Sequence, residues 1–127
     1  MRGNRASGTL GYDAAASYVE QQLRAAGYKP VRQVFTYRDD RRDTNVETFN
    51  ILADTAGDPA RTIVVGGHLD SVRRGPGIND NGSGVAPIPE TARWMAESGV
   101  KPKNRVRSAF WGLKRLICSV PSTSWIP

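Results

Sequence analysis

Apolar residues near the start of the chain recur every three to four positions, which is the spacing of one face of an α-helix. These residues are Ala15, Val19, Leu23 and Ala26. Asp13 is placed to cap such a helix or to lie in its first turn, and Gly27 is placed to end it. The pattern therefore predicts an amphipathic helix over residues 12–26.

Three following segments are rich in β-branched and aromatic residues and predict strands over residues 31–37, 46–53 and 62–68. The charged sequence RDDRRDTN between the first two predicts an exposed turn. The apolar residues Ile63–Val65 are consecutive, which is typical of a strand covered on both faces.

A glycine-rich loop over residues 73–82 separates these strands from a second helix, predicted over residues 83–97. Because an interior proline costs a helix ~3 kcal/mol, Pro87 and Pro89 predict that its regular part starts near Pro89. A last strand is predicted over residues 105–111. Helices and strands in this order predict an α/β layered fold.

The composition is that of one globular domain. The 127 residues are 39% hydrophobic and 24% charged, and no apolar run approaches the ~20 residues of a membrane helix. No apolar stretch follows the amino terminus, so no secretory signal is expected and the chain as written would be cytoplasmic. The single cysteine, Cys118, excludes a disulfide within the chain.

The net charge of +6 comes from the end of the chain. Acidic and basic residues balance over residues 1–97, whereas residues 98–127 hold six basic residues and no acid. An excess confined to a tail does not indicate a basic face that binds nucleic acid. We therefore expect neither a nucleic-acid nor a membrane partner.

The sequence GGHLDSVRRGPGINDNGSG, residues 66–84, holds the only histidine, His68, together with Asp70 and Asp80. His68 and Asp70 are two positions apart at the carboxyl end of a predicted strand, so they share one face of an extended segment. A ring nitrogen of His68 could bind zinc, with Asp70 orienting the imidazole and Asp80 bridging two ions. The alternative is a structural histidine beside a polar turn, for which Asn81-Gly82 is a typical dipeptide. The residues alone leave both readings open.

The segment IVVGGHLDSVRRGPGINDNGSGVA resembles the zinc-dependent exopeptidases of the aminopeptidase Y type, which include secreted bacterial leucine aminopeptidases. The resemblance rests on His-Leu-Asp-Ser, on the twelve positions from His68 to Asp80, and on Asp-Asn-x-Ser-Gly. It continues upstream through NRASGTLGYDAAASYVEQQLRAAGY and downstream through KNRVRSAFWG, covering about residues 4–112.

This resemblance implies that residues 1–112 are the amino-terminal part of a zinc aminopeptidase domain. The implied fold is α/β, an incomplete three-layer zinc-exopeptidase-like domain with a mixed, mostly parallel sheet. The implied activity is hydrolysis of amino-terminal residues from peptides by a secreted enzyme with two zinc ions. By resemblance His68 is a ligand of one zinc, Asp80 is the bridging carboxylate, and Asp70 orients His68 from behind.

The sequence departs from the family pattern after Gly112. The family has Ala-Glu-Glu there, in which one glutamate is the general base and the other a zinc ligand, whereas this chain has Leu113, Lys114 and Arg115. Lysine and arginine do not ligate zinc at neutral pH. We therefore expect the chain alone to bind zinc weakly, as a single ion, and to be inactive, and we expect loop 73–82 to be mobile without metal.

Residues 113–127 are expected to be a basic tail without homology to the family. Loss of one G from codons for Ala-Glu-Glu gives codons for Leu-Lys-Arg, which favours a shifted reading frame. The alternative is a non-catalytic binding module whose tail contacts an anionic partner through Trp111, Lys114, Arg115 and Trp125.

Overall fold

The computed structural model describes residues 3–114. Of the expected tail, only Leu113 and Lys114 are among them, and the rest lies outside the described residues. The elements in chain order are α1 (Leu10–Ala25), β1 (Val31–Asp39), β2 (Thr44–Asp54), β3 (Asp58–His68), a kinked segment η1 (Ile78–Gly82), α2 (Ser83–Val85), α3 (Pro87–Glu97) and β4 (Asn104–Trp111). None of the helices in this part of the chain is both long enough and apolar enough to cross a membrane.

The first helix begins earlier than its apolar spacing predicts. Thr9 is the N-cap, because its hydroxyl accepts a hydrogen bond from the backbone N–H of Tyr12 (3.3 Å), while Asp13 lies in the first turn. At the other end Gly27 has a positive φ of 93°, and its N–H donates to the carbonyl of Arg24 (2.9 Å). The glycine therefore ends the helix as predicted.

The prolines of the second predicted helix mark a boundary within it. Pro87 occupies the first position of α3, where a proline removes no helical hydrogen bond. The regular helix therefore starts at Pro87 rather than near Pro89, and residues 83–85 form the separate short helix α2.

The four strands form one mixed sheet in the order β1-β2-β4-β3. A tight turn joins β1 and β2 into an antiparallel hairpin, β2 pairs with β4 antiparallel, and β3 pairs with β4 parallel through the α2–α3 connection. The mixed sheet is as predicted. The expected parallel majority is not found among the strands of residues 3–114, where two of the three pairings are antiparallel.

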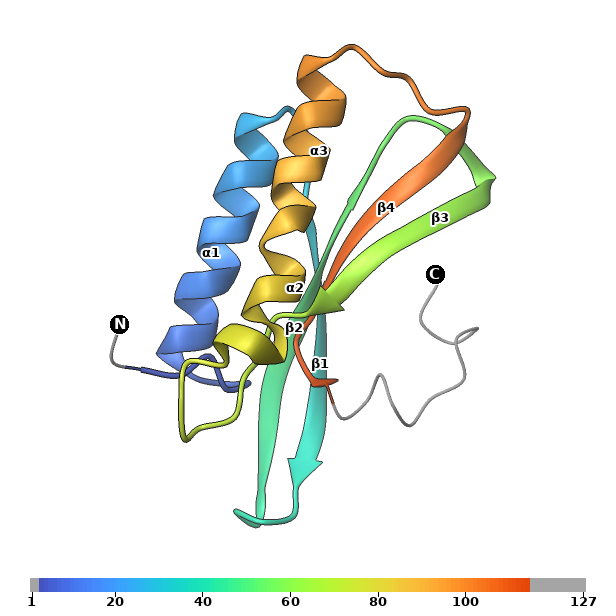
Figure 1. Ribbon diagram of the computed structural model, residues 1–127. Helices are drawn as coiled ribbons and strands as arrows, with labels where there is room; N and C mark the ends of the chain where they lie inside the picture. The colour runs from blue at the N-terminus through green and yellow to red at the C-terminus, as the bar shows by residue number, and fades with distance from the viewer. Residues whose placement is uncertain (1–2, 115–127) are drawn as a thin grey trace.

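Both long helices, α1 and α3, lie on the same side of the sheet (Figure 1). The core between them and the sheet centres on Tyr12 and Leu23 of α1, Phe49 and Ile51 of β2, and Phe110 of β4. The rings of Tyr12 and Phe49 meet edge to face at 5.3 Å. Phe110 of this core lies at the carboxyl end of β4, which pairs with the carboxyl end of β3. The candidate site lies at these two strand ends.

The predicted burial of Ile63–Val65 is wrong for the described part of the chain. Within residues 3–114, β3 is an edge strand, and the exposed fractions of Ile63, Val64 and Val65 are 52%, 39% and 40%. Only at Gly67 and His68 does the strand become buried. β3 has the apolar sequence that is typical of a central strand, but it is the edge strand here. No strand of residues 3–114 pairs with its outer side.

Candidate metal centre

The imidazole of His68 lies between the two aspartates that the sequence singled out. His68 is the last residue of β3, and its Nδ1 is 3.1 Å from Oδ1 of Asp70. Its Nε2 is 2.9 Å from Oδ1 of Asp80, which reaches the site from η1. His68 and Asp70 are buried, at 9% and 8% exposed, whereas the Asp80 side chain is 60% exposed. The structure therefore brings together all three predicted site residues.

Two glycines before His68 allow the close packing at this end of the sheet. A Cβ at Gly66 would lie 2.6 Å from the ring of Trp111, and one at Gly67 would lie 3.0 Å from both Asn81 and Val85. Because neither glycine has a side chain, the Trp111 ring, Asn81 of η1 and Val85 at the end of α2 can approach the strand directly. The two glycines thus permit close packing of Trp111, Asn81 and Val85 next to His68.

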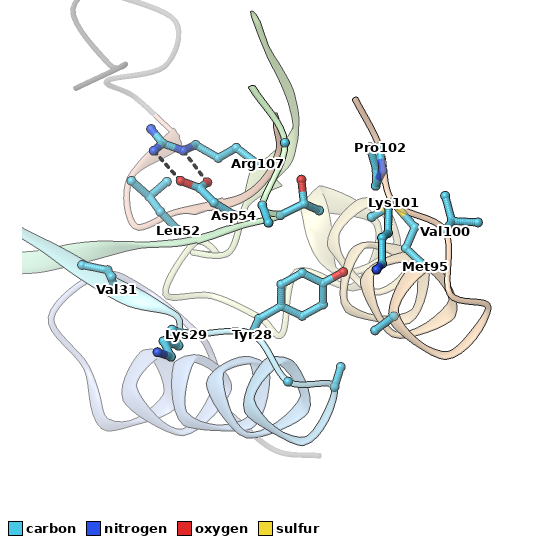
Figure 2. Close-up of a pocket in the computed structure, with 16 residues that line it drawn as sticks. Tyr28, Lys29, Val31, Leu52, Asp54, Met95, Val100, Lys101, Pro102 and Arg107 are labelled. Carbon is cyan, nitrogen blue, oxygen red and sulfur yellow. Dashed lines mark hydrogen bonds and ion pairs between the residues drawn. The ribbon is translucent and has the colours of Figure 1, made fainter. Parts of the chain in front are cut away.

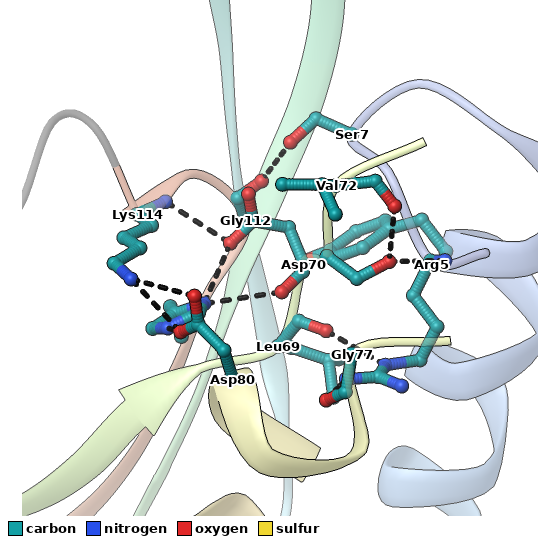
Figure 3. A network of polar contacts seen from close by, with 12 residues as sticks. Arg5, Ser7, Leu69, Asp70, Val72, Gly77, Asp80, Gly112 and Lys114 are labelled. Atoms are coloured by element: carbon teal, nitrogen blue, oxygen red, sulfur yellow. Dashed lines mark hydrogen bonds and ion pairs between the residues drawn. The ribbon is translucent and has the colours of Figure 1, made fainter. Parts of the chain in front are cut away.

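The loop that carries Asp80 is held in place by Arg5, a residue that the sequence analysis did not single out. The backbone N–H of Arg5 donates to Oγ of Ser71 (2.7 Å), and the side-chain Nε of Arg5 donates to the carbonyl of Leu69 (3.0 Å). Its guanidinium also donates to the carbonyls of Pro76 and Gly77 (Figure 3). No local sequence pattern predicts this role of Arg5, because its contacts join positions 64 to 72 residues apart.

Lys114 supplies a positive charge at the same place. Its Nζ lies 2.8 Å from each carboxylate oxygen of Asp80, and its backbone N–H donates to Oδ1 of Asp70 (3.0 Å) (Figure 3). The Lys114 ammonium holds the pKa of the Asp80 carboxyl below its usual range. Burial raises the pKa of Asp70, and the hydrogen bond from the Lys114 backbone opposes that shift. The sequence analysis placed Lys114 and Arg115 where the family has its two glutamates, and in the structure Lys114 contacts both aspartates of the site.

These residues face an open pocket of about 870 Å³. His68, Asp70, Asp80 and Lys114 line this pocket. Two pairs of arginines also line it, one from the β1–β2 turn and one from the loop after β3: Arg41, Arg42, Arg73 and Arg74. A second pocket of about 900 Å³ lies where α1, β2 and α3 end (Figure 2). Among the described residues that line it, Asp54 is the one carboxylate, and two nitrogens of Arg107 bind it (2.7 and 2.8 Å). The described part of this second pocket therefore has no group like the His68–Asp80 pair.

The residues described do not fit a pair of zinc ions. Among residues 3–114 no group of three or more histidine, cysteine, aspartate or glutamate side chains is arranged to hold a metal ion. A catalytic zinc ordinarily has three protein ligands at about 2.0–2.3 Å. Here His68 and Asp80 can supply two, and the Lys114 ammonium contacts both oxygens of the carboxylate.

Several known proteins are similar to this chain in sequence and in fold. Residues 50–113 match the model of Peptidase family M28. The chain is 42% identical over 115 residues to leupeptin-inactivating enzyme 1 of Streptomyces exfoliatus, covering 90% of this chain and 25% of that protein. It is 52% identical over 67 residues to an aminopeptidase of Pseudomonas aeruginosa, covering 52% of this chain and 12% of that protein.

Solved structures agree with the fold. Glutaminyl cyclase of Fimbriiglobus ruber superposes with a TM-score of 0.76 at 26% identity, over 85% of this chain and 39% of that one. A Zn-dependent exopeptidase of Parabacteroides distasonis superposes with a TM-score of 0.72 at 22% identity, over 97% of this chain and 47% of that one. The chain thus spans less than half of each of these proteins, and it has the zinc-exopeptidase-like α/β fold. On the match over residues 50–113, the chain belongs to Peptidase family M28.

Proposed function

We propose that residues 1–112 are the amino-terminal part of an M28 aminopeptidase domain that acts on peptides with a free amino terminus. In this proposal His68 and Asp80 are metal ligands, and Asp70 orients His68. The observation that carries it is the His68 ring between two aspartates, with Nδ1 facing Asp70 and Nε2 facing Asp80. Metal-bound histidines commonly have a carboxylate behind the ring in this way.

We further propose that the 127-residue chain alone does not hydrolyse peptides. By resemblance Lys114 and Arg115 take the places of a general base and a zinc ligand, and Lys114 contacts Asp80 instead of providing a carboxylate. A general base must accept a proton from the attacking water, and an ammonium group has no lone pair with which to do so. The proposed domain therefore contributes part of a site and lacks its acid–base group.

Calorimetric titration with Zn²⁺ and a turnover assay on leucine anilide test both statements. We expect at most one zinc ion per chain, bound more weakly than ~10 μM because two ligands are too few for a structural or catalytic site, and no turnover above buffer. His68→Ala and Asp80→Ala should each abolish the binding. Asp13→Asn, which changes an exposed aspartate on α1, should leave it intact. Two zinc ions bound at micromolar affinity or better, or turnover dependent on His68, would contradict the proposal.

A further inference from the structure

The described part of the site already contains a cation, namely the ammonium group of Lys114. It lies 2.8 Å from both oxygens of Asp80, and one of these oxygens also faces Nε2 of His68 at 2.9 Å. We infer that Lys114 is a built-in cation that takes the place of a metal ion beside His68 and Asp80, and that it suppresses metal binding there. This inference rests on the proposed role of His68 and Asp80 as a ligand pair.

The distances make the ammonium and a metal ion competitors. A zinc ion bound by Asp80 would lie about 2.1 Å from the coordinating oxygen, and Nζ of Lys114 lies 2.8 Å from the same oxygens. The two positive charges could then be no more than about 5 Å apart, a separation at which like charges repel strongly beside a protein surface. Zinc can therefore bind this carboxylate well only after the ammonium has moved away.

The backbone of Lys114 is hydrogen-bonded at the site, which keeps its side chain within reach of Asp80. Its N–H donates to Oδ1 of Asp70 (3.0 Å), and two residues earlier the N–H of Gly112 donates to Oδ1 of Asn50 (2.9 Å). A Cβ at Gly112 would lie 2.3 Å from the carbonyl oxygen of Phe49, so this part of the chain lies directly against β2. A charge attached to a backbone held in this way competes as if it were present at high concentration.

Within the described part of the chain, the two charged side chains that contact the His68 ring are both carboxylates, although four arginines also line the pocket. Two carboxylates, Asp70 and Asp80, face the two ring nitrogens. Among residues 3–114, the Lys114 ammonium contacts Asp80, whereas Asp70 accepts a hydrogen bond from the Lys114 backbone N–H. Removal of the Lys114 charge would leave two carboxylates in contact with one imidazole, in a pocket that the four arginines still line. Such a set of oxygen and nitrogen donors attracts a divalent ion.

The experiment compares Lys114→Gln with Lys114→Arg in the 127-residue chain. Glutamine removes the charge at similar length, whereas arginine retains it, and Lys29→Gln serves as a control in the second pocket. If the ammonium occupies its position for about nine-tenths of the time, its removal raises Zn²⁺ affinity about tenfold. We expect that gain for Lys114→Gln by calorimetry at fixed pH and ionic strength, and none for the other two variants.

Thermal unfolding with and without Zn²⁺ gives a second readout. We expect Zn²⁺ to raise the melting temperature of Lys114→Gln more than that of the unchanged chain, because a ligand that binds only the folded state stabilises it. Addition of Asp80→Asn should remove the gain. If Lys114→Gln is unfolded without metal, recovery of its circular dichroism spectrum by Zn²⁺ supports the inference, and failure to recover overturns it.

The outcomes separate this inference from the proposed function. If Lys114→Gln binds Zn²⁺ no more tightly than the unchanged chain, and that weak binding still needs His68 and Asp80, the built-in cation is refuted and the ligand pair stands. If neither chain shows binding that depends on His68 and Asp80, the proposed ligand roles fail, and the inference fails with them.

Discussion

Tyr12 joins the first helix to the middle of the sheet by one buried hydrogen bond. Its ring is fully buried, and its hydroxyl donates to the backbone carbonyl of Phe49 at 2.6 Å. Burial raises the pKa of this phenol well above its usual range, so it remains a donor at any ordinary pH.

Tyr12→Phe tests how much this single contact contributes. The substitution leaves the packing of the ring but removes the donor to a buried carbonyl, so we expect the free energy of unfolding to fall by about 1–2 kcal/mol. Urea denaturation at neutral pH measures the change. Tyr18→Phe, on the exposed side of the same helix, is the matched control and should change stability by less than about 0.5 kcal/mol. Equal effects of the two substitutions would refute this role for the Tyr12 hydroxyl.

The sequence could predict single residues of the site where local spacing decides their position. His68 and Asp70 share one face because they are two positions apart at a strand end, and Asp80 returns to them through a loop of tight turns. Arg5 and Lys114 could not be predicted in the same way. Their positions depend on how the ends of the described chain fold against the loop, and no local pattern encodes those contacts.

At the scale of elements, an ion pair between Glu20 and Arg32 connects α1 to β1. Nε and Nη2 of Arg32 donate to the two carboxylate oxygens of Glu20 at 2.7 and 2.8 Å, and the guanidinium lies 4.2 Å from the centre of the Phe49 ring. The Glu20 side chain is buried and that of Arg32 is partly exposed. The hydrogen bonds from Arg32 hold the pKa of Glu20 below its usual range.

Glu20→Gln should lower stability in a pH-dependent way. A carboxyl whose pKa is depressed by folding stabilises the folded state above its unfolded pKa, about 4.3, and loses that contribution as the pH falls through its folded pKa. We therefore expect the variant to be about 1–2 kcal/mol less stable at pH 7, with the difference shrinking below about pH 4.3. Urea denaturation between pH 7 and pH 3 measures it, with Glu47→Gln, an exposed glutamate of β2, as the control. A difference that grows on acidification would contradict the pair.

The elements themselves were largely predictable, because each has a clear apolar period or turn signal. The errors have local physical causes. The Thr9 hydroxyl caps α1 so that the helix starts two residues before the predicted residue 12, and a proline is accepted at the first position of α3. The neighbours of β3 were not predictable from its own residues. The hydrophobic pattern of an apolar strand does not show whether other elements cover that strand.

At the scale of the whole molecule, the sheet ends in an apolar edge. Ile63, Val64 and Val65 lie on the outermost strand of the described sheet and are each at least 39% exposed. An edge strand offers unpaired backbone groups to another chain, and apolar side chains along it add to the attraction. The molecule therefore carries a surface prone to self-association.

Ile63→Lys should reduce that self-association. A lysine on an edge strand opposes edge-to-edge pairing through its charge, and we expect a larger monomer fraction at ~100 μM with less than about 1 kcal/mol lost in stability, because the site is half exposed. Analytical ultracentrifugation over a concentration series measures the fraction. Leu10→Lys, which places the same charge at an exposed apolar position on α1, should leave association unchanged. An unchanged chain that is monomeric throughout the series would refute the prediction.

The Arg5 contacts also bear on the order in which the molecule assembles. Arg5 meets Ser71, Leu69, Pro76 and Gly77 across 64 to 72 positions of sequence. Contacts between distant positions require a large loop to close, and they form slowly compared with those inside a helix or hairpin. During synthesis 64 residues are added after Arg5, up to and including its first partner, Leu69. That is more than half of these 127 residues. Arg5 is therefore expected to find its native contacts late, after the helices and the β1–β2 hairpin have formed.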